Sequence, residues 1–350
     1  MGEVLGIGLT HYPPLCGLDE EMADPLGWAL DDPGIPADRK DPANWPTAMQ
    51  DEWSDPVAAA RSHRRTLLDG FARCRAELDA FAPDVAIVFG DDQYENFRED
   101  LIPPFAVLAY DDLVARPWAD AQHSSAMTGK ANIWGEPPET EFRVRTRRDV
   151  GRELVTGLLE RGVDVAYAYE PRHHESLPHS FMNTLLFLDY ERRGFDHAIV
   201  PFAINCYGRT VISSRGLATP FGDDREPDPP SPHPSRMMAV GAAVADVIAE
   251  APWRVALVAT SSWSHAFLCD KTWRLMPDLD ADRALYDDMV RADYAGIAGR
   301  TLAELEEAGQ QETLNWFTLF GAMRRLERSP RWSTFVESYI FNSNKVFAVF

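Results

Sequence analysis

The chain has 350 residues, of which 45% are hydrophobic and 25% are charged, and its formal net charge is -21. That length and hydrophobic content suffice for one large buried core. The negative charge repels polyanions and no run of Lys or Arg offsets it, so nucleic acid and anionic membrane surfaces are excluded as expected partners.

Four cysteines stand far apart in the sequence, at positions 16, 74, 206 and 269, and form no C-x-x-C pair. We therefore expect reduced thiols and a cytoplasmic location. The N-terminus shows no basic stretch followed by an apolar leader, and no apolar run reaches the ~18 residues of a membrane span. No association with a membrane is expected.

In the first part of the chain, short apolar runs predict buried strands at residues 4–9, 85–89 and 105–109. Apolar positions at helical spacing predict a helix over residues 56–80. The segment 18–53 is a long polar loop rich in Pro, Asp and Trp. Because loops of that length in compact domains usually serve a function, we interpret it as a packed lid.

The alternation of helix and strand patterns continues to the C-terminus. Helices are predicted at 148–161, 181–192 and 235–250 and over most of 281–328, and strands at 163–168, 198–203 and 255–259. This alternation predicts an α/β fold with a central, mostly parallel or mixed sheet flanked by helices. We expect one domain over residues 1–350, with 18–55, 110–141 and 220–235 as lid or surface-loop insertions.

Polar side chains that can bind a metal follow several of the apolar runs. They are His11, Gln93, His173, His174, His179 and His265. A single histidine after a strand more often forms a hydrogen bond than binds a metal. However, the carboxyl ends of parallel strands meet at one edge of a sheet, where α/β proteins bind their ligands. The sequence therefore predicts the functional site at this edge.

Glu312 lies at the start of an amphipathic helix in Gln-Gln-Glu-Thr-Leu-Asn-Trp-Phe. A carboxylate at that position has two interpretations. It can simply suit the positive end of the helix dipole. It can also be an oxygen ligand for a metal ion.

Several segments share their residue types, order and spacing with one known family. They are Gly-Leu-Thr-His11-Tyr-Pro-Pro, the strand from Pro83 ending in Asp-Asp-Gln93-Tyr-Glu-Asn-Phe, Ser262-Trp-Ser-His265, Glu312-Thr-Leu-Asn-Trp316 followed by Gly321-Ala-Met, and Asn342-Ser-Asn before the apolar C-terminus. Together they resemble the class III, LigB-type extradiol ring-cleavage dioxygenases. The resemblance covers most of the chain and implies a LigB-like fold.

The resemblance implies a mononuclear Fe(II) site held by two histidines and one glutamate, with Mn(II) or Zn(II) as possible substitutes. His11 and Glu312 match two of the family's ligands, whereas Gln93 stands where the family has its second histidine. An amide oxygen is a weaker donor than imidazole for this metal. Gln93 is the predicted third ligand, and the alternatives are Asp92, His63 and His123.

The family's acid/base histidine segment matches Pro178-His179-Ser-Phe-Met-Asn-Thr-Leu-Leu, which nominates His179 as the catalytic acid/base. His173 and His174 are alternatives for this role, and His174 stands with His179 among the catalytic candidates. His265 is the third candidate, since it can hydrogen-bond a substrate oxygen or brace its own loop.

The resemblance implies an enzyme of aromatic catabolism that uses O2 to open a catechol-type ring or an aminophenol. Its partners are then a small aromatic substrate and O2, in a homo-oligomer that could include a small partner subunit. Two alternatives remain open. One is a hydrolase or lyase in which the altered His, Gln and Glu site holds Zn(II) and activates water. The second is a non-catalytic LigB-like binding subunit without iron.

Overall fold

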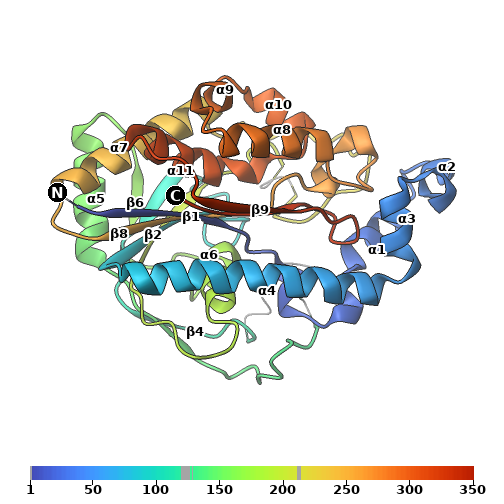
Figure 1. Ribbon diagram of the computed structural model, residues 1–350, viewed down its shortest axis with the longest axis horizontal. Coiled ribbons are helices and arrows are strands. Elements are labelled where there is room, and N and C mark those ends of the chain that lie inside the picture. The colour runs from blue at the N-terminus through green and yellow to red at the C-terminus, as the bar shows by residue number, and fades with distance from the viewer. Residues whose placement is uncertain (1, 120–126, 128, 211–213) are drawn as a thin grey trace.

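The computed structural model describes residues 2–119, 127, 129–210 and 214–350. Within these ranges, eight strands form one sheet in the order β6-β3-β7-β2-β8-β1-β10-β9 (Figure 1). The strands are β1 (Val4–Leu9), β2 (Val85–Asp91), β3 (Phe105–Leu108), β6 (Ala166–Ala168), β7 (Ile199–Ile204), β8 (Val255–Thr260), β9 (Trp332–Val336) and β10 (Lys345–Val349). A separate pair joins β4 (Leu113–Ala115) to β5 (Phe142–Val144).

The four central strands, β7, β2, β8 and β1, run parallel to one another. Toward the edges, β3 is antiparallel to β7, and β10 is antiparallel to both β1 and β9. Every residue of the four central strands is buried, as expected for parallel strands that helices cover on both faces. The predicted α/β class, with a mostly parallel central sheet between helices, is confirmed.

Helices cover both faces of the sheet (Figure 1). On one face lie α4 (Pro56–Phe81) and α6 (His179–Leu188), and on the other lie α5 (Arg148–Glu160), α7 (Pro234–Glu250) and α11 (Leu314–Arg325). Three shorter helices, α8 (Leu279–Val290), α9 (Tyr294–Ala298) and α10 (Leu302–Glu307), lie beyond α7 and α11. Alternate side chains of β2 enter the two resulting cores, since successive residues of a strand point to opposite faces.

Helices α7 and α11 cross at two glycines. A Cβ atom on Gly241 would lie 1.8 Å from the carbonyl oxygen of Thr318, and one on Gly321 would lie 2.0 Å from that of Met238. Any larger side chain would therefore collide with the opposite backbone. This close contact fixes α11, and with it the preceding turn Gln311–Thr313, against the sheet.

The segment 18–53 differs from the predicted polar loop because it contains three helices. They are α1 (Asp24–Asp31), α2 (Ala37–Lys40) and α3 (Thr47–Ser54). These helices are too short to show a clear apolar period, but Leu26, Trp45 and Met49 are buried in the core. Side chains of this segment line the main pocket, as described below.

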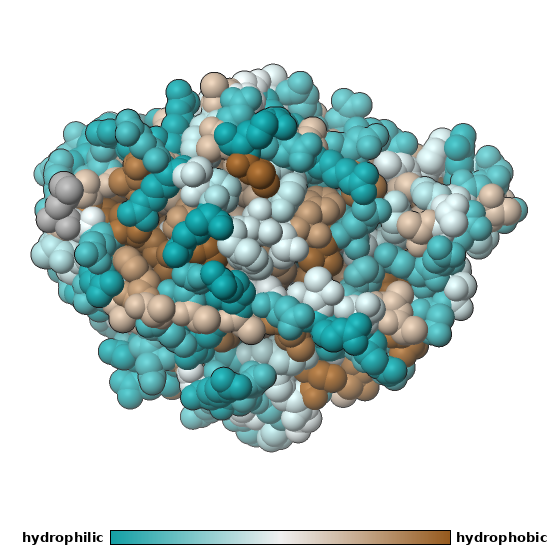
Figure 2. Space-filling view, viewed as in Figure 1, coloured by the Kyte–Doolittle hydropathy of each residue, from teal (hydrophilic) through white to brown (hydrophobic). Residues whose placement is uncertain are grey.

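Hydrophilic residues cover most of the face shown in Figure 2, and apolar ones show mainly in recesses between them. Among the helices in the described ranges, none is both long and apolar enough to cross a membrane. Residues 220–230 form a mostly exposed loop, as predicted from their Pro and Asp content.

Candidate metal centre and pocket

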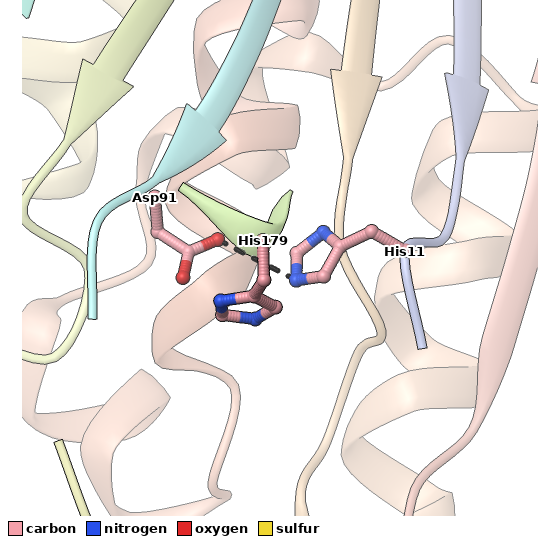
Figure 3. Close-up of side chains that lie close together, drawn as sticks. All are labelled: His11, Asp91 and His179. Atoms are coloured by element: carbon pink, nitrogen blue, oxygen red, sulfur yellow. Dashed lines mark ion pairs between the residues drawn. The ribbon is translucent and has the colours of Figure 1, made fainter. Parts of the chain in front are cut away.

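Three neighbouring parallel strands end at the same edge of the sheet and each places a polar side chain there. His11 follows β1, Asp91 is the last residue of β2, and His265 follows β8. His179, the first residue of α6, joins them from a helix on one face. Figure 3 shows His11, Asp91 and His179 converging just beyond the strand ends. The sheet edge thus concentrates polar groups where parallel α/β sheets bind ligands.

His11, Asp91 and His179 form a group that can hold a metal ion. One ligand atom from each lies within 4.8 Å of the others, and all three residues are buried. Nε2 of His11 is 3.6 Å from Oδ1 of Asp91. The rings of His11 and His179 meet edge to face, with centroids 5.2 Å apart. Two imidazoles and one carboxylate are the donor set of many non-haem Fe(II) sites.

Glu312 lies near the same imidazole nitrogen. Its Oε1 is 3.8 Å from Nε2 of His11, and its Oε2 is 3.3 Å from Nε2 of His265. The hydroxyl of Tyr207 donates a hydrogen bond to Oε1. His11 therefore has two buried carboxylates near the same nitrogen atom.

Outer hydrogen bonds orient both histidines of the group. Nδ1 of His11 is hydrogen-bonded to the Thr260 hydroxyl at 3.2 Å. Nδ1 of His179 lies 3.0 Å from Oε2 of Glu95, whose Oε1 accepts the backbone N–H of His179 at 2.8 Å. With Nδ1 engaged in each ring, Nε2 is the nitrogen left for a ligand. Metal-binding histidines are commonly held in this way by a hydroxyl, carbonyl or carboxylate.

Burial and the neighbouring charges shift the pKa values of these groups, and a bound cation would lower the raised pKa values of the two carboxyl groups. Burial raises the pKa of Asp91 to about 6, and burial together with the nearby Asp91 raises the pKa of Glu312 well above its usual value. Burial and the neighbouring histidines hold the pKa of His11 well below 6.5. Burial alone would lower the pKa of His179, but Glu95 outweighs it and the pKa rises to about 9.

Two carboxylate oxygens at this centre have no hydrogen-bond partner among the described residues, namely Oδ2 of Asp91 and Oε2 of Glu312. Buried acceptors without a partner carry a large desolvation cost. A divalent cation would neutralise the two acids and accept their free lone pairs. The donor set therefore fits a metal ion.

Gln93 occupies a different position from the three clustered residues. Its side-chain amide donates to the carbonyl oxygen of Gly216 at 3.1 Å, and the residue lines the neighbouring pocket. The carboxylate that reaches the cluster comes from Asp91, which the sequence did not nominate. The assignment of Gln93 as a ligand stays a prediction, and the geometry favours Asp91 in that role.

Asp92 and His63, two further candidates for the third ligand, form contacts away from the cluster. The carboxylate of Asp92 accepts backbone N–H groups of residues 95–97 and so shapes the turn after β2. Nε2 of His63 pairs with Glu52 at 3.0 Å. The last candidate, His123, lies outside the described residues.

The remaining histidine candidates differ in their surroundings. His173 pairs with Asp100 at 2.8 Å near the surface. His174 is buried, and its Nδ1 accepts the N–H of Ser176 at 3.1 Å. Neither belongs to the group formed by His11, Asp91 and His179. His265 lies beside Glu312, and burial lowers its pKa to about 3.

Three participants were missed from the sequence, and they are Asp91, Glu95 and Tyr207. Only Asp92 was weighed as a ligand, but successive residues at a strand end point to opposite faces, and it is the adjacent Asp91 that reaches the cluster. Glu95 follows in the same turn. Tyr207 follows β7, and no motif in the sequence marks it.

A cavity of about 450 Å³ opens beside the cluster, and His11, His179, His265 and Glu312 all contribute to its wall. Much of the remaining wall is aromatic or aliphatic, from Tyr12, Trp28, Ile35, Phe267 and Phe341. Cavities of this size, apolar with a few converging polar groups, are typical of small-molecule sites. An aromatic ring can therefore pack beside the candidate metal centre.

Comparison with known proteins adds independent information. No protein-family model matches the chain. The chain is 27% identical over 214 residues to a "2,3-dihydroxyphenylpropionate/2,3-dihydroxicinnamic acid 1,2-dioxygenase 1" of Dechloromonas aromatica, covering 61% of this chain and 52% of that protein. Two proteins named 2,3-dihydroxyphenylpropionate/2,3-dihydroxicinnamic acid 1,2-dioxygenase, from Azotobacter vinelandii and Rhodococcus rhodochrous, are 25% and 26% identical to this chain. The matches cover 55% and 56% of this chain and 47% and 48% of theirs.

The chain thus spans about half the length of the curated relatives that it matches. Among solved structures, it resembles an uncharacterized protein from Escherichia coli K12 with a TM-score of 0.42 and 12% identity, covering 79% of this chain and 91% of that one. That likeness is too weak to support an argument.

Proposed function

We propose that this protein is a metal-dependent dioxygenase that uses O2 to open the ring of an aromatic diol or a related aminophenol. The observation that carries the proposal is the buried group of His11, Asp91 and His179 beside a largely apolar cavity. The names of the distant relatives, all dioxygenases of dihydroxylated aromatic acids, support the same reaction type. Our proposal that the ring opens at the extradiol position is based only on the LigB-type resemblance.

For the metal, we propose Fe(II), with Mn(II) or Zn(II) as possible substitutes, held by His11, Asp91 and His179. Held by two histidines and one carboxylate, Fe(II) would supply Lewis-acid and redox chemistry for an aromatic diol and O2. Glu312 is the nearest further oxygen donor, at 3.8 Å from His11. The sequence alone led to a different proposal, in which the ligands are His11, Gln93 and Glu312 and the acid/base is His179. Both proposals place the metal at the same edge of the sheet.

The surrounding residues would bind the ring and move its protons. The aromatic side chains of Tyr12 and Phe341 line the cavity and are stacked on each other with centroids 5.1 Å apart, giving a flat apolar wall that excludes water. On the polar side, Glu312 is hydrogen-bonded to Tyr207 and lies next to His265. This trio can accept a proton from a hydroxyl group of the substrate and return it to the product.

No specific observation favours a hydrolytic or a non-catalytic function. A Zn(II) hydrolase or lyase could use the same donors, but the relatives carry dioxygenase names. A non-catalytic subunit gives no reason for two buried carboxylate oxygens that lack a hydrogen-bond partner among the described residues and lie beside a ligand-sized cavity.

Oxygen uptake tests the proposal. The protein is stripped of metal, loaded with Fe(II) without air, and mixed with a panel of catechols and aminophenols while dissolved O2 and the ultraviolet-visible spectrum are recorded. We expect O2 consumption equimolar with loss of one of the diols and dependent on added iron. No uptake with any diol by protein that retains stoichiometric iron would contradict the proposal.

A further inference from the structure

One guanidinium, that of Arg274, lines the cavity in addition to the three histidines of the candidate metal centre. Among the described lining residues it is the single Lys or Arg, whereas Asp31, Asp32 and Glu312 are acidic. Asp32 is already engaged, because its carboxylate accepts the backbone N–H groups of Gly34 and Phe221 at 2.8 and 2.6 Å. Apart from the histidines assigned to the metal centre, Arg274 is therefore the one described lining side chain that can pair with an anionic group.

Contacts with Asp270, Thr219 and the ring of Phe221 hold the guanidinium of Arg274 in place and leave part of it free. Nε donates to Oδ1 of Asp270 at 2.6 Å, and Nη1 donates to the carbonyl oxygen of Thr219 at 2.6 Å. Nη2 has no hydrogen-bond partner among the described residues, and it is not sealed from solvent. The Arg274 side chain is 15% exposed, whereas that of Asp270 is 64% exposed. Because Asp270 is exposed to solvent, its ion pair with Arg274 offsets little of the positive charge of the guanidinium.

The backbone at this point is also unusual. Trp273 and Arg274 both adopt the left-handed conformation, with φ of 58° and 57°. Neither residue is Gly, Asn or Asp, the types that tolerate this region best, so each costs conformational energy. Contact of the Trp273 ring with the ring of Phe221, with centroids 5.3 Å apart and planes tilted by 34°, helps to hold the turn. This turn places the Arg274 side chain in the cavity wall.

From this geometry we infer that Arg274 is a carboxylate-binding subsite within the cavity. A guanidinium presents paired N–H groups that match the two oxygens of a carboxylate. Because the net charge of -21 repels anions at long range, an acidic substrate needs a local cation such as this one. If the proposed function holds, the substrate is then an aromatic diol that carries an acidic side chain, with its ring at the histidines and its carboxylate at Arg274.

Binding of substrate fragments without the diol tests the subsite separately from the reaction. Isothermal titration compares 3-phenylpropionate with the neutral 3-phenylpropanamide on the protein as purified. We expect the carboxylate to bind about tenfold or more tightly, the range for a charge-assisted hydrogen bond. Arg274→Gln should abolish this preference and Arg274→Lys should reduce it. The matched control is Arg39→Gln, since Arg39 lies 5.2 Å from the ring of Trp273 but does not line the cavity.

Equal binding of the two fragments by the unaltered protein would overturn the inference, even if Arg274→Gln failed to fold. So would a preference that persists in Arg274→Gln, because the carboxylate would then bind elsewhere, such as at a metal ion. A preference lost in Arg274→Gln and kept in Arg39→Gln supports the subsite whether or not any diol is cleaved. Failure of the proposed function and failure of this inference are therefore distinguishable.

Discussion

At the scale of single residues, the buried charges around His11 decide what the site can bind. Asp91 and Glu312 both approach Nε2 of His11, at 3.6 and 3.8 Å, and each keeps one oxygen without a hydrogen-bond partner among the described residues. Without a cation, this arrangement costs free energy through repulsion and desolvation. A bound divalent ion would turn the same arrangement into a favourable one.

Metal content should separate the two possible ligand sets. We expect His11→Ala, Asp91→Asn and His179→Ala each to lose most of the bound iron, measured by elemental analysis after dialysis against a weak chelator. Gln93→Ala should retain the iron, because the side-chain amide of Gln93 is hydrogen-bonded to the carbonyl oxygen of Gly216. Full iron occupancy in Asp91→Asn, together with loss of iron in Gln93→Ala, would favour the ligand set predicted from the sequence. Iron retained in His179→Ala with turnover lost, roughly 10²- to 10⁴-fold, would return His179 to an acid/base role.

Metal affinity should rise with pH. The pKa of His179 is raised to about 9 and that of Asp91 to about 6, so the metal-free protein holds protons near neutrality that a bound ion must displace. Each displaced proton makes affinity rise about tenfold per pH unit below the pKa of its group. Calorimetry in buffers of different ionisation enthalpy counts these protons. Affinity that stays constant between about pH 6 and 8 would mean that His179 is not a ligand.

The sequence predicted several residues that the structure brings together at one cavity, but it missed others that lie beside them. His11, His179, His265 and Glu312 were all nominated, and the structure brings them to the wall of one cavity. Asp91 was missed because residue types cannot show which of two adjacent acids points toward the sheet edge. Glu95 and Tyr207 were missed because their roles depend on the positions of His179 and Glu312, which only the tertiary structure fixes.

At the scale of elements, the crossing of α7 and α11 controls the position of Glu312. Gly321→Ala should destabilise the fold by about 1–3 kcal/mol, since its new Cβ would meet the carbonyl of Met238 at 2.0 Å. Gly27→Ala in α1 is the matched control, because a Cβ there has no neighbour within 4 Å. That change should be neutral or stabilise by up to ~1 kcal/mol. Urea unfolding measures both, and equal stability of the two variants would contradict the packing argument.

Elements with a clear hydrophobic period were predicted well, and those without one were not. The strand at 4–9 and the helix at 56–80 agree with β1 and α4 within one residue. The short helices α1 to α3 were read as a loop, because four to eight residues rich in Pro and Asp show no period. Strand β9 was not predicted, since its pairing with β10 is a tertiary contact.

At the scale of the whole molecule, the chain brings distant segments to one edge of the sheet. The cavity wall takes residues from the N-terminal helical segment, from the loop at 216–220 and from the C-terminal residues 341–343. The curated relatives are about twice as long as the part that this chain matches. The candidate metal centre and the cavity beside it nevertheless lie within this chain and use residues from its beginning to its end.

Isotope labelling tests the central claim, which is incorporation of O2 into an aromatic ring at this metal centre. The iron-loaded protein is supplied with ¹⁸O₂ and the diol that supports O2 uptake, and the ring-opened product is examined by mass spectrometry. We predict that the new carboxylate of the product carries an ¹⁸O atom, and that His11→Ala forms no labelled product. A product whose new oxygen comes from water would contradict the account and indicate a hydrolytic reaction instead.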